Sequence, residues 1–184
     1  DPEQDLEVMQ DSQSDMKVRG RLEPVEIPGY ARIFIDYAHN AVSLENVLTT
    51  LRQYRPKRLI CLFGCGGNRS AGRRKGMGFV SGRLADMTVI TSDNPRFESP
   101  EAIMTDIETG VLEGGGEYVK ICSRLDAIRY ALEISDRDDI VLLAGKGHET
   151  YQDIEGRRTQ MDEREMIRQI LEEKNAGIVR RCDN

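Results

Sequence analysis

The sequence contains no apolar run that approaches the ~20 residues a helix needs to cross a membrane. Its charged beginning is not expected to be a secretory signal peptide. Positive charge is also scarce: the net charge of −6 over 184 residues argues against nucleic acid as the main partner. These absences predict a cytoplasmic protein whose partner is neither a membrane nor a nucleic acid.

Cysteine and histidine are too few to suggest a metal centre. The chain has four cysteines and two histidines, and the only close cysteine pair is Cys61 and Cys65. That spacing, with so few histidines to complete a site, leads us to predict no metal site. Cys61 lies inside an apolar run, which predicts a reduced, buried thiol.

Two common nucleotide-binding motifs are missing. No Gly-x4-Gly-Lys-Ser/Thr sequence occurs in the chain, so a Walker P-loop is excluded. The glycines at 64–67 have the wrong spacing for a dinucleotide fingerprint. A plain glycine turn and an anion site explain this segment equally well.

What the sequence does contain is a regular alternation of apolar strands and amphipathic helices. Strands are expected at 25–27, 31–35, 59–63, 87–90, 118–121 and 140–144, with a hairpin over 151–160. Helices are expected after the capping residues Asn40, Ser99, Ser123 and Asp162, and around 72–84. The pattern predicts an α/β fold with a doubly wound, mostly parallel sheet and helices on both faces.

The ends of the chain are weakly patterned. Residues 1–17 are acidic and polar, and we interpret them as a leader or as the remnant of a junction with a missing central domain. Residues 18–174 form the predicted domain. Residues 175–184 are interpreted as a tail.

Four of the predicted strands end in polar or glycine-rich loops. These loops are 36–40, 64–69, 92–96 and 145–149. Because the carboxyl ends of parallel strands share one edge of a sheet, the loops are expected to converge on one crevice, where ligands bind in open α/β sheets.

The loop 92–96 carries the most specific chemistry. Asn94 and Pro95 fix a stiff turn, and Arg96 follows with a planar guanidinium that suits a carboxylate. A surface turn in which Arg96 pairs with Glu98, or with nothing, is the competing interpretation. The basic cluster at 69–75 suits a small anion better than a duplex.

Several loop residues have two interpretations. Lys146 contacts a phosphate or is a solvated loop lysine, and Glu149 holds an ammonium group or pairs with a nearby arginine. Asp36 is a magnesium-associated carboxylate or a helix cap. His39 and His148, in loops at strand ends, favour ligand contact over burial. An arginine facing a carboxylate suits a zwitterion, so the residues alone predict a small-anion or amino-acid site.

Five segments taken together resemble the carboxy-terminal domain of the Mur ligases, and in particular of the members that add meso-diaminopimelate. They are Asp-Tyr-Ala-His at 36–39, Leu-Glu-Asn-Val-Leu at 44–48, Phe-Gly-Cys-Gly-Gly-Asn-Arg at 63–69, Thr-Ser-Asp-Asn-Pro-Arg at 91–96 and Ala-Gly-Lys-Gly-His-Glu at 144–149. The resemblance covers about residues 18–172, with the segments in the family's order. Two positions depart from it: Asn40-Ala41-Val42 replaces a common Thr-Pro-Asp, and Asn68 replaces a common aspartate.

The resemblance implies ATP-dependent formation of an amide bond. ATP phosphorylates the D-glutamate carboxylate of UDP-MurNAc-L-Ala-D-Glu, and the amino group of the incoming amino acid attacks the acyl phosphate. The carboxy-terminal domain supplies the amino-acid pocket and closes over the nucleotide. ATP and Mg²⁺ are held mainly by a central domain that this chain lacks, so no catalytic residue is expected here and the chain alone is expected to be inactive.

The resemblance also implies roles for particular residues. Asp-Asn-Pro-Arg is the family's recognition motif for meso-diaminopimelate, with arginines for the distal carboxylate and Glu149 for the neighbouring ammonium. The implied substrate-binding residues are Arg69, Asp93, Asn94, Pro95, Arg96, Gly145 and Glu149, and those on the nucleotide side are Asp36, His39 and Asn40. Two alternatives remain: a sibling ligase that adds L-lysine, which Arg96 disfavours, and a stand-alone module that binds an amino acid or a nucleotide.

Overall fold

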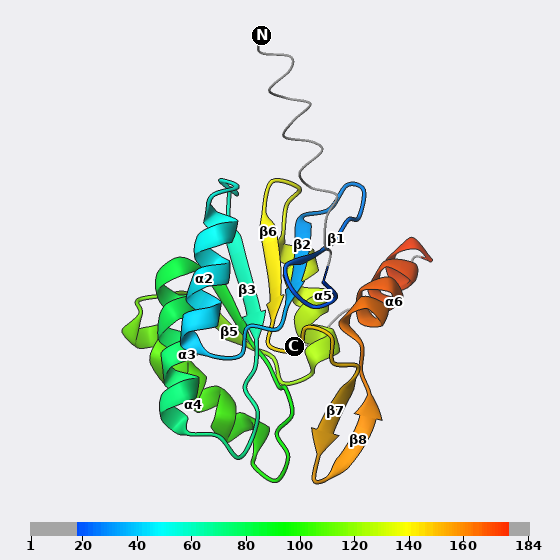
Figure 1. The fold of residues 1–184 in the computed structure, drawn as a ribbon. Helices are drawn as coiled ribbons and strands as arrows, with labels where there is room; N and C mark the ends of the chain where they lie inside the picture. The colour runs from blue at the N-terminus through cyan, green and yellow to red at the C-terminus, as the bar shows by residue number, and fades with distance from the viewer. Residues whose placement is uncertain (1–17, 177–184) are drawn as a thin grey trace.

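The computed structural model describes residues 18–176, and its centre is a six-stranded sheet (Figure 1). The strand order is β1-β2-β6-β3-β4-β5, and every pair is parallel except β1 with β2. The strands are β1 (Glu23–Val25), β2 (Arg32–Asp36), β3 (Leu59–Phe63), β4 (Met87–Ile90), β5 (Tyr118–Lys120) and β6 (Ile140–Ala144). The prediction of a mostly parallel sheet is therefore confirmed.

Helices cover both faces of this sheet (Figure 1). One core contains side chains of α2 (Ala41–Arg52), α3 (Ala71–Leu84) and α4 (Pro100–Glu113), and the other contains those of α5 (Arg124–Ile134) and α6 (Glu163–Asn175). β3 serves both cores, because Cys61 and Phe63 face the first while Ile60 and Leu62 face the second. The doubly wound arrangement is confirmed.

The predicted capping residues begin their helices. The side-chain oxygens of Asn40, Ser99, Ser123 and Asp162 each accept a hydrogen bond from a backbone N–H in the first turn of the helix that follows. Within the described residues, no helix has the length and apolarity required to cross a membrane. The leader predicted at 1–17 lies outside the described part of the chain. So does most of the predicted tail, and its first residue, Asn175, still belongs to α6.

The first strand differs from its prediction. It spans Glu23–Val25 instead of 25–27, because the turn around Pro28 and Gly29 takes up Ile27, whose carbonyl accepts the Tyr30 N–H at 3.1 Å. The two-stranded ribbon of β7 (Tyr151–Ile154) and β8 (Arg157–Gln160) confirms the predicted hairpin. Its turn residues, Glu155 and Gly156, have φ of 51° and 77°, as this type of tight hairpin requires.

Helices α3 and α4 pack with their backbones nearly touching. A Cβ atom added at Gly78 of α3 would lie 2.1 Å from the carbonyl oxygen of Ile107 in α4. One added at Gly110 of α4 would lie 2.0 Å from the carbonyl oxygen of Lys75. Only glycine permits so close an approach. The contact fixes the position of α3, whose first turn faces the cleft described next.

Candidate functional site

The four polar loops meet at the carboxyl edge of the sheet, as predicted. They follow β2, β6, β3 and β4, which are consecutive neighbours in the strand order. Together they enclose a cleft whose lining contains most of the predicted site residues. The lining residues are Tyr37, His39, Gly64, Cys65, Gly66, Arg69, Arg73, Asp93, Asn94, Arg96, Gly145 and Glu149.

Three predicted site residues do not line this cleft. The buried carboxylate of Asp36 accepts the N–H groups of Leu22 and Ala38, both at 2.7 Å. Asn40 caps α2, and the buried Pro95 supports the turn that precedes Arg96. These local contacts explain why the three residues are present, and their proposed ligand contacts remain predictions.

The hairpin holds the loop that contains Arg96. The Arg96 N–H donates to the carbonyl of Asp153 at 3.0 Å, and the Glu155 N–H donates to the carbonyl of Arg96 at 2.8 Å, which makes a short parallel bridge to β7. Gln152 adds a hydrogen bond from its Nε2 to the Asp93 carbonyl at 2.7 Å. These bonds stabilise Arg96 in a left-handed conformation, with a φ of 53°.

The guanidinium of Arg96 lies against the glycine turn after β3. Its Nη1 donates to the carbonyl of Gly67, and Gly66 lies beside it. Glu98 pairs instead with Arg74, at 2.8 Å. The interpretation of Arg96 as the partner of Glu98 is therefore wrong.

The basic cluster at 69–75 divides into two parts. Arg74 is buried and bound to two acids, and Lys75 pairs with Glu113 at 2.7 Å. Arg69 and Arg73 line the cleft, and their side chains have no ion-pair partner among residues 18–176. Arg73 is absent from the predicted site, although its place in the basic cluster and in the first turn of α3 was a usable signal.

Lys146 is the largest departure from the sequence interpretation. Its side chain is 0% exposed, so it neither contacts a phosphate nor extends into solvent, and both predictions were wrong. Its Nζ lies 2.7 Å from the Tyr151 carbonyl, 3.1 Å from Asn94 Oδ1, 3.2 Å from Asp93 Oδ1 and 3.4 Å from Glu149 Oε2. This buried ammonium joins two of the cleft loops to β7.

Lys146 determines how the polar atoms of Asn94 and Glu149 are paired. Because Oδ1 of Asn94 accepts from Lys146 and from the Asp153 N–H, the amide nitrogen turns to Glu149 and donates to its Oε2 at 3.1 Å. The partners of Glu149 are thus a lysine and an amide, and not the predicted arginine. The other carboxylate oxygen of Glu149, Oε1, has no hydrogen bond in the described part of the chain. It is also not fully buried, so a ligand can reach it.

Both histidines are exposed and flank one tyrosine. The ring centroids of His39 and His148 lie 4.8 and 5.0 Å from that of Tyr37. Burial raises the pKa of Tyr37, and the nearby Glu149 carboxylate raises it further. Tyr37 and His39 therefore form an aromatic wall of the cleft, whereas His148 does not line it.

The cysteines fit a reduced protein. Cys61 and Cys65 are free and buried, which confirms the prediction for Cys61. No group of three or more potential metal ligands occurs within residues 18–176.

Thiol labelling should separate these cysteines. Burial raises the pKa of both Cys61 and Cys65 to about 12, so in the folded chain neither should form the reactive thiolate near neutral pH. Of the three cysteines within residues 18–176, the exposed Cys122 should be alkylated first, and faster as the pH is raised. Peptide mass spectrometry with and without denaturant would measure the rates. Equal labelling of Cys65 and Cys122 in the folded chain would contradict the structure.

Comparison with known proteins identifies the family of this chain. The family described as Mur ligase, glutamate ligase domain, matches residues 20–147. The UDP-N-acetylmuramoyl-L-alanyl-D-glutamate–2,6-diaminopimelate ligase of Caldanaerobacter subterraneus subsp. tengcongensis is 44% identical over 168 residues, which are 91% of this chain and 35% of that protein. A second ligase of the same name, from Clostridium acetobutylicum, is 45% identical over 154 residues, or 84% of this chain and 32% of its own length.

A solved structure gives the same result. The structure of a UDP-N-acetylmuramoyl-L-alanyl-D-glutamate–2,6-diaminopimelate ligase superimposes with a TM-score of 0.79 and 35% identity, covering 87% of this chain and 33% of that one. The chain thus spans about a third of the length of the relatives it matches. The resemblance seen in the five sequence segments is confirmed: the chain belongs to the Mur ligase family and corresponds to its glutamate ligase domain.

Proposed function

We propose that this chain is the amino-acid-binding domain of a cytoplasmic ligase that joins meso-diaminopimelate to UDP-MurNAc-L-Ala-D-Glu in peptidoglycan synthesis. The observation that carries the proposal is the charge arrangement of the cleft. Arg69, Arg73 and Arg96 line the same cavity as Glu149, whose Oε1 is available. The names of the similar ligases support this substrate.

The distal end of meso-diaminopimelate carries a carboxylate and an ammonium group on one carbon. In the proposed complex the guanidinium groups bind the carboxylate, and Oε1 of Glu149 accepts from the ammonium. Arg96 is already oriented by its bond to Gly67, and Glu149 by Lys146 and Asn94. Preorganised partners of this kind bind with a smaller loss of side-chain entropy.

The same arrangement disfavours L-lysine, whose distal end has no carboxylate. The arginines would then lack an anion in a partly enclosed site, which costs affinity. A sibling ligase that adds lysine is therefore the weaker candidate. The other candidate is a binding module without a ligase attached. The two differ in the domain that accompanies this chain, because a ligase requires a P-loop domain in the same protein.

In the proposed ligase, ATP and Mg²⁺ are bound mainly outside this chain, which has no P-loop. ATP activates the D-glutamate carboxylate of UDP-MurNAc-L-Ala-D-Glu as an acyl phosphate. The residues of this chain hold the distal end of meso-diaminopimelate so that its other amino group can attack that acyl phosphate. The residues predicted for the nucleotide side remain His39, Asp36 and Asn40, of which His39 lines the cleft.

Titration of the isotope-labelled chain with meso-diaminopimelate and with L-lysine tests the proposal. We expect saturable amide shifts around Arg69, Asn94, Arg96 and Glu149 with meso-diaminopimelate. Arg96→Ala should weaken this binding by about tenfold or more, because it removes a charged hydrogen-bond donor. As a matched control, Arg168→Ala removes an exposed arginine on α6 and should change nothing.

The outcomes separate the candidates. An equal response to lysine would refute the role of Arg96. If neither compound shifts any resonance, the titration should be repeated with a full-length ligase that contains this domain. Failure there as well would end the proposal.

A further inference from the structure

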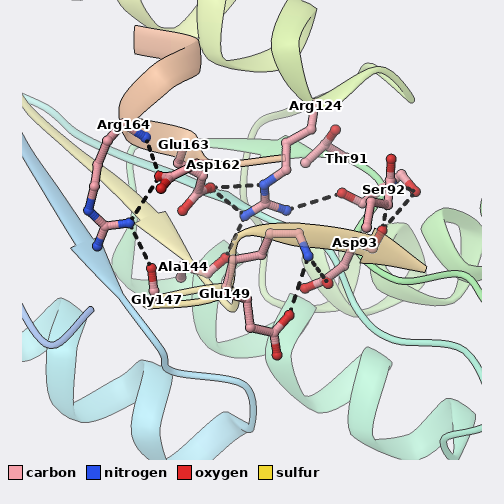
Figure 2. A network of polar contacts seen from close by, with 12 residues as sticks. Thr91, Ser92, Asp93, Arg124, Ala144, Gly147, Glu149, Asp162, Glu163 and Arg164 are labelled. Atoms are coloured by element: carbon pink, nitrogen blue, oxygen red, sulfur yellow. Dashed lines mark hydrogen bonds and ion pairs between the residues drawn. The ribbon is translucent and has the colours of Figure 1, made fainter. Parts of the chain in front are cut away.

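Arg124 is buried directly behind the cleft. It is the first residue of α5, its side chain is 0% exposed, and it does not line the cleft. Figure 2 shows its contacts with Ser92, Ala144 and Glu163. The sequence pattern predicts only the start of an amphipathic helix here. A fully buried arginine is costly unless each of its donors has a partner.

Its guanidinium binds the backbone of two cleft loops at once. Nη1 donates to the carbonyl of Ser92 at 3.1 Å, and Nη2 donates to the carbonyl of Ala144 at 3.0 Å. The next residues along the chain, Asp93 and Gly145, both line the cleft. Because β3 separates β4 from β6 in the sheet, no ladder hydrogen bond joins these two loops. Lys146 joins them through side chains, and Arg124 joins them through their backbone carbonyls.

Glu163 holds the guanidinium in place from the other side. It is the first residue of α6, its side chain is 1% exposed, and its Oε1 lies 2.8 Å from Nη2 and 2.9 Å from Nε (Figure 2). Its Oε2 has no partner among the described residues, so Glu163 serves Arg124 alone. The neighbouring Arg164 donates to the Gly147 carbonyl at 3.1 Å and fastens the same helix to the loop after β6.

We propose that Arg124, fixed by Glu163, is a positioning residue that sets the spacing of the ligand-binding loops after β4 and β6. The fork of a guanidinium can reach two carbonyls while it pairs with a carboxylate, which a lysine ammonium cannot do in the same geometry. The predicted effect of Arg124 on ligand affinity rests on the proposed function. Its predicted effect on the spacing of the two loops is independent of that function.

The test compares two variants with a remote control. Arg124→Lys keeps the charge and loses the fork. The double variant Arg124→Met with Glu163→Met removes both charges, so that no unpaired ion stays buried. The remote control uses an ion pair at the opposite edge of the sheet, where Arg58 and Asp139 lie 2.7 Å apart and their side chains are 38% and 0% exposed. The control variant is Arg58→Met with Asp139→Met.

Two measurements are made on each variant beside its melting temperature. The first is the affinity for meso-diaminopimelate, which should fall about tenfold or more in both Arg124 variants, since small displacements of binding groups are expensive. In the control it should stay within about twofold at a comparable loss of melting temperature. Equal losses of affinity in all three variants would show that Arg124 has only a general structural role.

The second measurement needs no ligand. The N–H groups of Ser92 and Gly145 are hydrogen-bonded, to the carbonyls of Cys122 and Asp36, and their hydrogen exchange reports on the two loops. Exchange at both should accelerate in the Arg124 variants and not in the control. If the unmodified chain and a full-length ligase both fail to bind meso-diaminopimelate, the proposed function is refuted. The exchange measurement still decides the role of Arg124, and unchanged exchange at Ser92 and Gly145 in the Arg124 variants would refute that role.

Discussion

Replacement of Lys146 by methionine should destabilise the folded chain by about 3–5 kcal/mol, a large fraction of the stability of an ordinary domain. Methionine fills a similar volume but cannot neutralise Asp93 and Glu149 or donate to the Tyr151 carbonyl. Two carboxylates would then face each other around an apolar group. Denaturant unfolding measures the loss as a change in the free energy of unfolding.

A lysine on the surface provides the control. Lys57 pairs with Asp136, but both side chains are more than 60% exposed, at 63% and 64%. Lys57→Met should therefore leave the free energy of unfolding nearly unchanged, because water and salt screen such a pair. If the two substitutions had the same effect, Lys146 would not be the buried hub that its contacts describe.

A single methyl group in α3 should have an effect of similar size. Gly78→Ala would place a Cβ atom 2.1 Å from the Ile107 carbonyl oxygen and 3.0 Å from the Val111 nitrogen. Both are backbone atoms of α4, so the two helices must separate, and we expect a loss of about 3 kcal/mol or more. The melting temperature and the free energy of unfolding would record it.

The same helix contains its own control. A Cβ atom at Gly72 would meet nothing within 4 Å, and that position is exposed in the first turn. Gly72→Ala should be neutral or should stabilise by up to about 1 kcal/mol, because alanine loses less backbone entropy in a helix. Opposite signs for the two Gly→Ala changes would confirm that contact with α4, and not helix propensity, determines the result.

Much of the fold could be predicted because its signals are local. Capping residues such as Ser99 mark helix starts, and continuous apolar runs such as 59–63 mark strands buried on both faces. The convergence of the loops followed from the rule that parallel strands end at one edge of the sheet. Seven of the ten residues predicted for the site accordingly line the cleft.

The remaining features depend on pairing between distant segments. The glycines on either side of Lys146 have φ of 101° and 52°, conformations that send the side chain inward, and its partner Asn94 lies 52 residues earlier. Arg124 meets Glu163 across 39 residues. No local pattern predicts that these charges are buried, since lysine and arginine are usually exposed.

The placement of the hairpin and α6 has a consequence for synthesis on the ribosome. All six strands of the main sheet are complete once Ala144 has been made, and the family match ends at residue 147. The parts that organise the cleft come later: Glu149, the β7 backbone that pairs with Arg96, and Glu163. In the order of synthesis, the strands of the main sheet therefore precede the groups that complete the cleft. The residues that complete the proposed amino-acid site are thus the last part of the domain to be made.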